Sequence, residues 1–448
     1  MNNNEAYVAR IGNFQPIEGA DRIIQASVIL NGVVQTQVVV GKSDYNEGDL
    51  VVYFDSNLCL DPIIIEDIDK HHKDYGKEGF VSIARYLAKG NRVKTVKLKN
   101  TISDGLVVSV DKFFQFLDKK TSELFVEGYS FNDIGPTHVC HKYFPPVRMQ
   151  STPGSKKDRK KRKLISRVIP DMFKFHVDTL ALLKNSHKLY PEMVASCSRK
   201  IHGTSSIASY TKVLKKLKWY EKLLKKIKVN IVDTEYDYLY ASRTVVKNDL
   251  LNGTGFYSVN VWQEAGEKYF KGKLHKGETV YFEIVGYLPS TQTYIQKPFD
   301  YGCNVGEYKI AVYRITLTSD DGTVSEYSWN AMKERCKELN VPMVEEFFYG
   351  RLGDMYKDIA WDENWNINFV QRLQEQFLEG DCPLCKNKVP EEGIVIRPDS
   401  LYIEPFKLKS KRFILKESEL KEKEDFVDIE DEESCGDKER ALAEDFNS

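Results

Sequence analysis

The pattern of the first third of the chain constrains its fold more than any other feature. Residues 1 to about 135 alternate short β-rich runs with turn pairs such as Asn31-Gly32 and Asp104-Gly105. Such pairs favour tight hairpin turns, so consecutive runs are expected to pair as antiparallel strands. The predicted strands are Ala6–Ile11, Ile23–Leu30, Val33–Val40, Asp49–Phe54, Val93–Leu98 and Gly105–Val110. Short strands at this spacing predict a small antiparallel barrel in residues 1–135, of the size of a five-stranded oligonucleotide-binding (OB) barrel.

The pattern changes after the barrel. Residues 136–170 contain Pro145-Pro146 and the basic run Lys156–Lys163, which predicts a linker that orders only against a polyanion. Residues 171–416 mix both periodicities and predict one α+β body, and the acidic residues 417–448 predict a frayed helix and a disordered tail. In the α+β body the predicted strands are Leu239–Arg243, Thr279–Gly286, Lys309–Leu317 and Gly393–Ile396, and the predicted helices are Val213–Lys228, Val259–Phe270, Trp329–Leu339 and Ile367–Leu378.

Length and charge exclude several classes of protein. A chain of 448 residues exceeds what one hydrophobic core usually supports, so we expect two or three domains. Its 65 basic and 66 acidic residues give no polycation signature, and its 8 cysteines are scattered as in reduced intracellular proteins. No apolar run approaches the length that spans a membrane. We therefore expect a soluble, cytoplasmic monomer with no membrane partner.

A lysine motif provides the first candidate for chemistry. Lys200-Ile201-His202-Gly203 follows the apolar Val194-Ala195, which predicts a nucleophile at the end of a strand. The glycine lets a backbone approach a bound phosphate, and the hydroxyls of Thr204 and Ser205 supply donors. A lysine near a glycine is common, so the motif needs supporting residues elsewhere.

Four downstream segments carry what nucleotide chemistry at a lysine needs. Arg243 ends a predicted strand and offers a fork of donors to phosphate or ribose oxygens. Glu283 is a carboxylate in an apolar strand, where it needs a hydroxyl, a cation or a metal as partner. Tyr313 is an aromatic that can cover a purine. The fourth segment pairs Glu392-Gly393 with Lys407 and Lys409, whose spacing of two along a strand points both ammonium groups to one face.

With these segments in order, the sequence resembles the covalent nucleotidyltransferase superfamily of polynucleotide ligases and RNA capping enzymes over about residues 190–412. The motif from Lys200 to Ser205 resembles that of nick-sealing RNA ligases, because DNA ligases and capping enzymes more often carry Asp at the position of His202. DNA ligases and capping enzymes also usually place the barrel last, whereas here it comes first. The barrel with Asn91–Lys94 and Ser103–Leu106, followed by Phe173–Thr179, resembles the Deinococcus and Naegleria RNA ligases.

The resemblance implies a multi-domain fold and an activity. An N-terminal all-β OB-fold barrel would precede an α+β nucleotidyltransferase domain, of the ATP-grasp-like ligase type, with central antiparallel sheets. The implied enzyme is an ATP-dependent RNA ligase acting in RNA repair. Lys200 would take AMP from ATP as lysyl-AMP, AMP would pass to a nucleic-acid 5′-phosphate, and a 3′-hydroxyl would displace it. The implied partner is a nicked duplex with RNA on the 3′-hydroxyl side.

The resemblance also implies a role for each site residue. An amine is nucleophilic only when neutral, so Lys407, Lys409 and a divalent cation would favour loss of its proton by like-charge repulsion. Glu392 would hold hydrated Mg²⁺ or Mn²⁺. His202 would contact either the metal-bound water or the phosphates. The remaining ATP-binding residues would be Gly203, Arg243 at the ribose or phosphates, Glu283 at a ribose hydroxyl and Tyr313 stacked on adenine.

Other interpretations remain open at this stage. A GTP-dependent capping guanylyltransferase would share Lys200, and a non-catalytic RNA-binding relative would keep the fold alone. A ligase that also joins DNA 3′ ends is a third alternative. Tyr313 is also a candidate core residue, and Glu283 a candidate for an ordinary ion pair. The predicted helix Val213–Lys228 is either an RNA contact or a solvated face. Cys382 and Cys385 resemble half of a zinc site, with His138, Cys140 and His141 as candidate partners.

Overall fold

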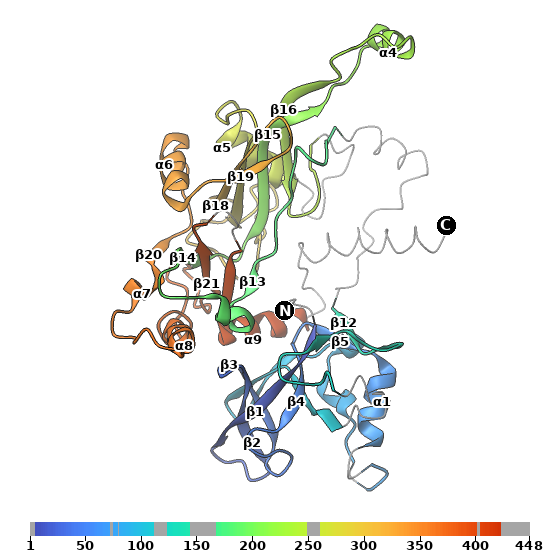
Figure 1. Cartoon of the computed structure of the whole chain (residues 1–448), viewed down its shortest axis with the longest axis vertical. Helices are drawn as coiled ribbons and strands as arrows, with labels where there is room; N and C mark the ends of the chain where they lie inside the picture. The colour runs from blue at the N-terminus through green and yellow to red at the C-terminus, as the bar shows by residue number, and fades with distance from the viewer. Residues whose placement is uncertain are drawn as a thin grey trace.

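The computed structural model describes residues 5–71, 75–78, 80–111, 123–143, 167–248, 260–400 and 404–422. Figure 1 shows two bodies, with a β-rich N-terminal body at the bottom and a larger mixed body above it. No helix in these ranges is long and apolar enough to span a membrane.

The N-terminal body is a curled antiparallel sheet. Its strand order is β3-β2-β1-β4-β8, and every neighbouring pair is antiparallel. Alternating residues of these strands fill buried clusters on the two faces, for example Val8 and Val52 on one and Ile11 and Val28 on the other. The strands are β1 (Ala6–Pro16), β2 (Ile23–Leu30), β3 (Val33–Gly41), β4 (Leu50–Phe54) and β8 (Leu106–Ser109), while β9 (Ser130–Phe131) joins β1 and β6 (Thr95–Leu98) pairs with β7 (Thr101–Asp104). The predicted OB-type barrel is therefore confirmed.

This body extends beyond the predicted boundary at residue 135. β12 (Cys140–Lys142) pairs with β5 (Leu58–Leu60), and Val139 and Cys140 are fully buried in the barrel core. The segment that follows the boundary is therefore barrel, not linker, because its apolar residues complete that core. Residues 144–166, which hold the basic run, lie outside the described residues. The remaining elements here are α1 (Pro62–Lys70) and the β10–β11 pair (Asp133–Ile134 and Thr137–His138).

The larger body contains two five-stranded sheets. One has the order β16-β15-β17-β18-β19 and is antiparallel throughout. The other has the order β13-β22-β21-β14-β20, in which only the β13–β22 pair is parallel. The strands are β13 (Leu180–Ala181), β14 (Val194–Lys200), β15 (Thr204–Leu214), β16 (Thr234–Ser242), β17 (Glu278–Gly286), β18 (Tyr308–Thr318), β19 (Val324–Glu326), β20 (Glu346–Arg351), β21 (Gly393–Pro398) and β22 (Phe406–Lys409).

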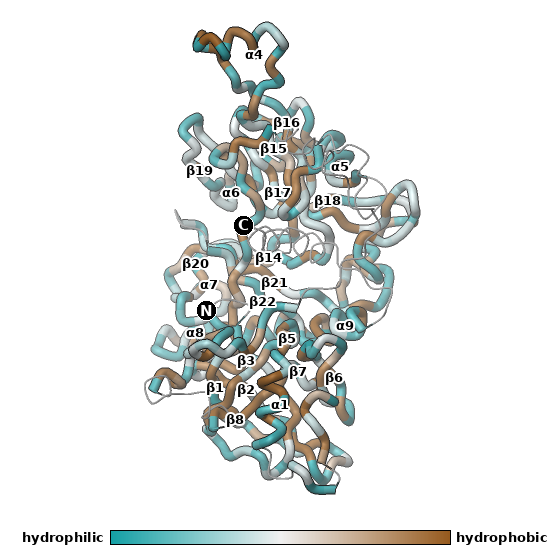
Figure 2. The backbone as a smooth tube through the Cα atoms, turned by 90° about the vertical axis from the view of Figure 1, so that its right-hand side faces the viewer, coloured by the Kyte–Doolittle hydropathy of each residue, from teal (hydrophilic) through white to brown (hydrophobic). Residues whose placement is uncertain are grey.

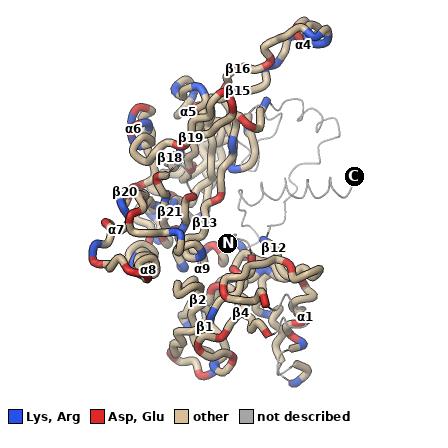
Figure 3. Tube along the Cα trace, viewed as in Figure 1, with Lys and Arg blue, Asp and Glu red and all other residues tan. Residues whose placement is uncertain are grey.

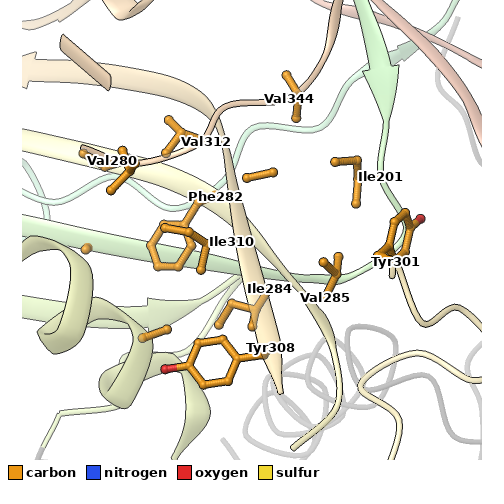
Figure 4. Close-up of a cluster of buried hydrophobic side chains, with 14 of the residues drawn as sticks. Ile201, Val280, Phe282, Ile284, Val285, Tyr301, Tyr308, Ile310, Val312 and Val344 are labelled. Carbon is orange, nitrogen blue, oxygen red and sulfur yellow. The ribbon is translucent and has the colours of Figure 1, made fainter. Parts of the chain in front are cut away.

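Helices cover both sheets. α5 and α6 contribute Trp262, Phe270 and Trp329 to the core of the first sheet. Figure 4 shows part of this core, including Phe282 of β17 and Ile310 of β18. α8 adds Trp365 and Phe369 to a separate core against β14 and β21. The helices are α4 (Trp219–Lys226), α5 (Val261–Phe270), α6 (Trp329–Leu339), α7 (Leu352–Met355), α8 (Trp365–Phe377) and α9 (Lys411–Lys421).

Two predicted segments differ from the structure. The predicted helix Val213–Lys228 is a strand up to Leu214 and a helix only over α4, because Val213 and Leu214 pair with Glu235 and Thr234 of β16. Local periodicity favoured a helix there, but the cross-strand ladder overrides it.

The predicted tail boundary at residue 417 falls inside α9. This helix contacts β6 and β7 of the barrel, and Phe413 and Leu420 are buried. The Thr95 N–H donates to Ser418 Oγ at 3.2 Å, and Lys421 Nζ donates to Asn57 Oδ1 at 3.1 Å. Residues 417–421 therefore help to join the two bodies, and residues 423–448 lie outside the described residues.

Candidate active site

The register of three strands builds the centre of the site. Lys200 is the last residue of β14 and pairs with Gly393 of β21, which in turn pairs with Lys409 of β22. Gly393 has a φ of 146°, and a Cβ there would lie 2.0 Å from the Leu408 carbonyl oxygen. Glycine is therefore required where β21 approaches β22, and this close approach brings both lysines beside Glu392.

Glu392 is the buried charge between these lysines. Lys200 Nζ lies 2.7 Å and Lys409 Nζ 4.0 Å from Glu392 Oε1, and the carboxylate is 2% exposed. Burial would raise the pKa of Glu392, but the charges of Lys200 and Lys409 outweigh it and hold this pKa below its ordinary value. Glu392 is therefore ionised at neutral pH.

The second oxygen of Glu392 tests whether the site fits a divalent cation. Glu392 Oε2 is buried and accepts no hydrogen bond from the part of the chain that the structure describes. A buried carboxylate oxygen without a partner is costly, and hard cations such as Mg²⁺ and Mn²⁺ prefer such oxygens. The carboxylate therefore fits a hydrated divalent ion.

Two further charges flank this centre. Burial, with the charges of Lys409 and Lys200, lowers the pKa of Lys407 to about 8. Glu417 of α9 lies 3.5 Å from Lys409 Nζ and 3.4 Å from Lys421 Nζ. Burial acts to raise the pKa of Glu417, but these two lysines hold it well below its ordinary range. No sequence motif pointed to Glu417, because it lies eight residues beyond Lys409, in the predicted tail.

His202 and Gly203 form the turn after Lys200. The His202 ring packs edge-on against Phe299 and Phe413, with centroids at 5.1 and 5.0 Å. Burial lowers the pKa of His202, which favours the neutral imidazole. A Cβ on Gly203 would lie 2.5 Å from the Ile284 carbonyl oxygen, so glycine is needed for the turn to pack on β17. The predicted metal contact of His202 stays a prediction.

Tyr313 reaches the site through a β-bulge. In the β17–β18 ladder Tyr281 pairs with Arg314 and Phe282 with Val312, so Tyr313 is the extra residue. Bulges re-aim side chains and are frequent beside active sites. The Tyr313 hydroxyl lies 2.9 Å from Ser205 Oγ and 3.1 Å from His176 Nδ1, which orients the ring.

Arg243 follows β16 and is held from the segment before β14. Its guanidinium forms an ion pair with Asp178, and burial together with Arg243 lowers the pKa of His176 to about 3. Neutral His176 thus lies between Arg243 and Tyr313. His176 and Asp178 are site residues that the motif reasoning did not select, although both belong to the run Phe173–Thr179 quoted for the resemblance.

One cavity contains all of these groups. It has a volume of about 470 Å³ and is lined from both bodies, with Tyr7, Asp55 and Asn57 on the barrel side. The predicted site residues that line it are Lys200, His202, Gly203, Arg243, Glu283, Tyr313, Glu392, Lys407 and Lys409. The sequence prediction that these residues come together is therefore met by the geometry, while their individual roles stay predictions.

The zinc interpretation of Cys382 and Cys385 gains no support. Among the described residues no group of three or more His, Cys, Asp or Glu side chains is arranged to hold a metal ion. Cys382 instead packs in the core of the first sheet, whereas Cys140 lies in the barrel core. The two candidate halves belong to different bodies.

Fold and site together define a protein with an N-terminal OB-fold domain and a larger α+β domain, which contributes Lys200 and the other predicted site residues to the cavity. A family model for an OB-fold domain matches residues 6–110. No curated protein matches the chain.

The chain is similar to solved structures of Naegleria gruberi RNA ligase. An apo mutant form aligns with a TM-score of 0.54 and 16% identity over 92% of this chain and 98% of that one. A mutant with ATP and Mn gives 0.54 and 16% over 92% and 97%, and a form with pyrophosphate gives 0.54 and 16% over 92% and 98%. The resemblance to RNA ligases of the Naegleria type is thus confirmed at the level of the fold, in the domain order expected from the sequence.

Proposed function

We propose that this protein is an ATP-dependent RNA ligase that works through a lysyl-AMP intermediate and seals nicks with RNA on the 3′-hydroxyl side. The observation that carries the proposal is the convergence of nine predicted residues on one cavity with Lys200 at a strand end. The Naegleria gruberi structures that share this fold were solved with ATP and Mn, with AMP and Mn, and with pyrophosphate.

The first step is nucleophilic attack by Lys200. Its ammonium is paired with Glu392 at 2.7 Å, so one proton must pass to the solvent in the open cavity before the nitrogen can react. The Nζ–P bond then forms at the α-phosphorus of ATP, the bond to the bridging oxygen breaks, and pyrophosphate departs. Lys407 and Lys409 face the same cavity and stabilise the charge that develops on the phosphates.

The nucleotide is oriented by the other walls of the cavity. We assign adenine to the face of Tyr313, a ribose hydroxyl to Glu283, and the ribose or phosphates to Arg243, whose guanidinium Asp178 positions. Glu392, together with His202, would hold a hydrated Mg²⁺ or Mn²⁺, which when bound supplies positive charge beside the α-phosphate.

Two further transfers complete sealing. An oxygen of the nucleic-acid 5′-phosphate attacks the phosphorus of lysyl-AMP, which breaks the Nζ–P bond and regenerates Lys200. The 3′-hydroxyl then attacks the activated 5′-phosphate, the phosphodiester forms, and AMP leaves. The barrel wall of the cavity puts an OB-type surface beside the reacting ends, where such folds bind single strands.

Sealing of defined nicks tests this assignment. We expect a 5′-phosphate nick to be sealed with ATP when the 3′-hydroxyl strand ends in ribonucleotides, and at least about tenfold more slowly when it ends in deoxyribonucleotides. A one-atom difference recognised by hydrogen bonding is sufficient for such discrimination. Equal rates would contradict the proposed preference for RNA. Failure to seal any nick would contradict the proposed ligase activity.

The pKa of Lys407 predicts how nucleotide binding depends on pH. Its value of about 8 means that Lys407 is a cation below pH 8 and increasingly neutral above it. Because the cation attracts phosphates, we expect affinity for a non-cleavable ATP analogue to fall above about pH 8, by at most about tenfold per pH unit. The Lys407→Arg variant stays charged, so its affinity should be flat over the same range. Titration calorimetry on both sides of pH 8 measures this, and identical profiles for the two proteins would show that Lys407 is not the titrating group.

A further inference from the structure

A lysine-rich arm projects from the larger body on the side away from the barrel (Figure 1). β15 pairs with β17 only from Thr204 to Ser209, and then runs on to Leu214 with β16 as its partner in the sheet. This two-stranded extension carries α4 at its end. We call residues 215–233 the arm.

Both acidic residues of the arm are paired with lysines of the arm itself. Its only acidic residues are Glu221, which lies 2.7 Å from Lys215 Nζ, and Asp233, which lies 2.7 Å from Lys225 Nζ. Glu221 also accepts from the Lys218 N–H at 2.7 Å, which caps α4. Both acidic residues of the arm therefore already have lysine partners within it.

The other lysines of the arm leave a strong positive charge. Residues 215–233 contain seven lysines against these two acids. Lys222, Lys226 and Lys228 are exposed, and no acidic side chain within the described ranges forms an ion pair with any of them. Figure 3 shows the basic residues gathered at this tip. A concentration of unneutralised lysines on a projection attracts a polyanion.

An exposed apolar stripe lies beside these lysines. Trp219, Leu223 and Ile227 follow each other at intervals of four along one face of α4 and are 77%, 56% and 66% exposed. Lys222 and Lys226 each precede a stripe residue, so the lysines border the stripe. Figure 2 shows hydrophobic and hydrophilic residues side by side at the tip. Exposed apolar surface of this kind marks an interaction site.

The distance from Lys200 to the arm matches the length of a short duplex. Lys200 and the arm lie at opposite ends of β15, whose 11 residues span about 34 Å at the usual rise of an antiparallel strand. One turn of a nucleic-acid duplex, about 10 base pairs, covers the same distance. In Figure 1 the barrel lies on the other side of the strands that carry Lys200. A duplex with its nick at Lys200 thus reaches the arm on one side and the barrel on the other.

We propose that the arm binds the duplex flank that leaves the active site on the side opposite the barrel, about one helical turn from the nick. This inference rests on the proposed function. The lysines contact phosphates of the two strands, and the apolar stripe lies against the sugar edges of the wide, shallow minor groove of an RNA-containing duplex. The arm therefore extends the binding surface and sets a minimum flank length for tight binding.

The test compares two triple variants on nicked duplexes whose flanks are either about 6 or about 18 base pairs long on each side. In the arm variant Lys222, Lys226 and Lys228 are changed to Ala. In the control variant Lys271, Lys337 and Lys357, which are exposed on the body, are changed to Ala, so both lose three charges. Fluorescence anisotropy gives the Kd at several salt concentrations, and AMP labelling of each protein reports an intact catalytic domain.

We expect the arm variant to bind the substrate with two long flanks about tenfold more weakly, with a salt slope lower by about 2 to 3. Shortening the flank on the side opposite the barrel should raise the Kd of the wild type to that of the arm variant. Adenylation should stay unchanged in every protein. The inference is overturned if the Kd of the arm variant equals that of the control at all flank lengths. It is also overturned if, in a parallel assay with phosphatidylserine vesicles, the arm variant loses vesicle binding but keeps duplex binding. A wild type that forms no adenylate and seals no nick would instead refute the proposed function.

Discussion

Replacement of Lys200 by Ala is expected to reduce labelling by α-phosphate-labelled ATP at least about 1000-fold, because the variant lacks the nitrogen that forms the bond to phosphorus. Lys200 is the last residue of β14 and lies 24% exposed at the cavity, so its truncation leaves no buried void in the core. The variant should stay folded but with a lower thermal unfolding midpoint, because the buried Glu392 loses its charge partner at 2.7 Å. Gel autoradiography after denaturation measures the covalent adduct.

A surface lysine provides the matched control for this variant. Lys337 on α6 is 70% exposed, and among the described residues its ion-pair partner is Glu334, one helical turn away. Its replacement by Ala should leave labelling unchanged, since exposed ion pairs contribute little. A Lys200→Ala protein that is folded and still labelled would mean that another side chain is the nucleophile. A wild type that is never labelled would favour the non-catalytic RNA-binding alternative.

The Glu392→Gln substitution is expected to have the second largest effect, lowering the rate of adenylation by about 100-fold or more. The amide keeps the shape of the side chain but removes the charge between Lys200 and Lys409, and it binds divalent ions weakly. Half-maximal activity should consequently require more Mn²⁺ in the variant. Single-turnover rates of adduct formation over a Mn²⁺ titration separate these two losses.

The adjacent carboxylate controls for a general effect of buried charge. Glu391 is buried as well, but it pairs with Arg199 on the other side of the strand pair. Glu391→Gln should therefore lower thermal stability while leaving the Mn²⁺ dependence of adenylation as in the wild type. If Glu392→Gln retained the wild-type rate and metal dependence, the assignment of Glu392 to the cation would be wrong.

Local signals explain which parts of the fold were predictable. The hairpin turn at Asn31-Gly32 and the alternating strands around it depend on residues close together in the chain, and β2 and β3 lie where the pattern predicts them. Lys200 and Glu392 were predictable because each stands beside a strand end and a glycine with a steric reason to be there. Gly203 and Gly393 both lie too close to neighbouring backbone for any side chain.

Long-range contacts explain what the sequence did not reveal. The pairing of β12 with β5 joins residues about eighty positions apart, so no local sequence pattern predicts this pairing. The bulge at Tyr313 depends on the register of two strands, and Glu417 reaches the site only because α9 packs on the barrel. The helix prediction over Val213–Lys228 was wrong for the same reason, because its first residues pair with β16.

Transfer of AMP from ATP to Lys200 is the central step of the proposed reaction, and one measurement tests it directly. The wild-type protein is incubated separately with ATP and with GTP, digested, and analysed by mass spectrometry for the nucleotide and the modified lysine. We predict AMP on the peptide that contains Lys200, only in the ATP sample, and its loss when pyrophosphate is added back. A GMP adduct formed from GTP alone would identify a capping guanylyltransferase, and AMP on any residue other than Lys200 would contradict the proposed active site.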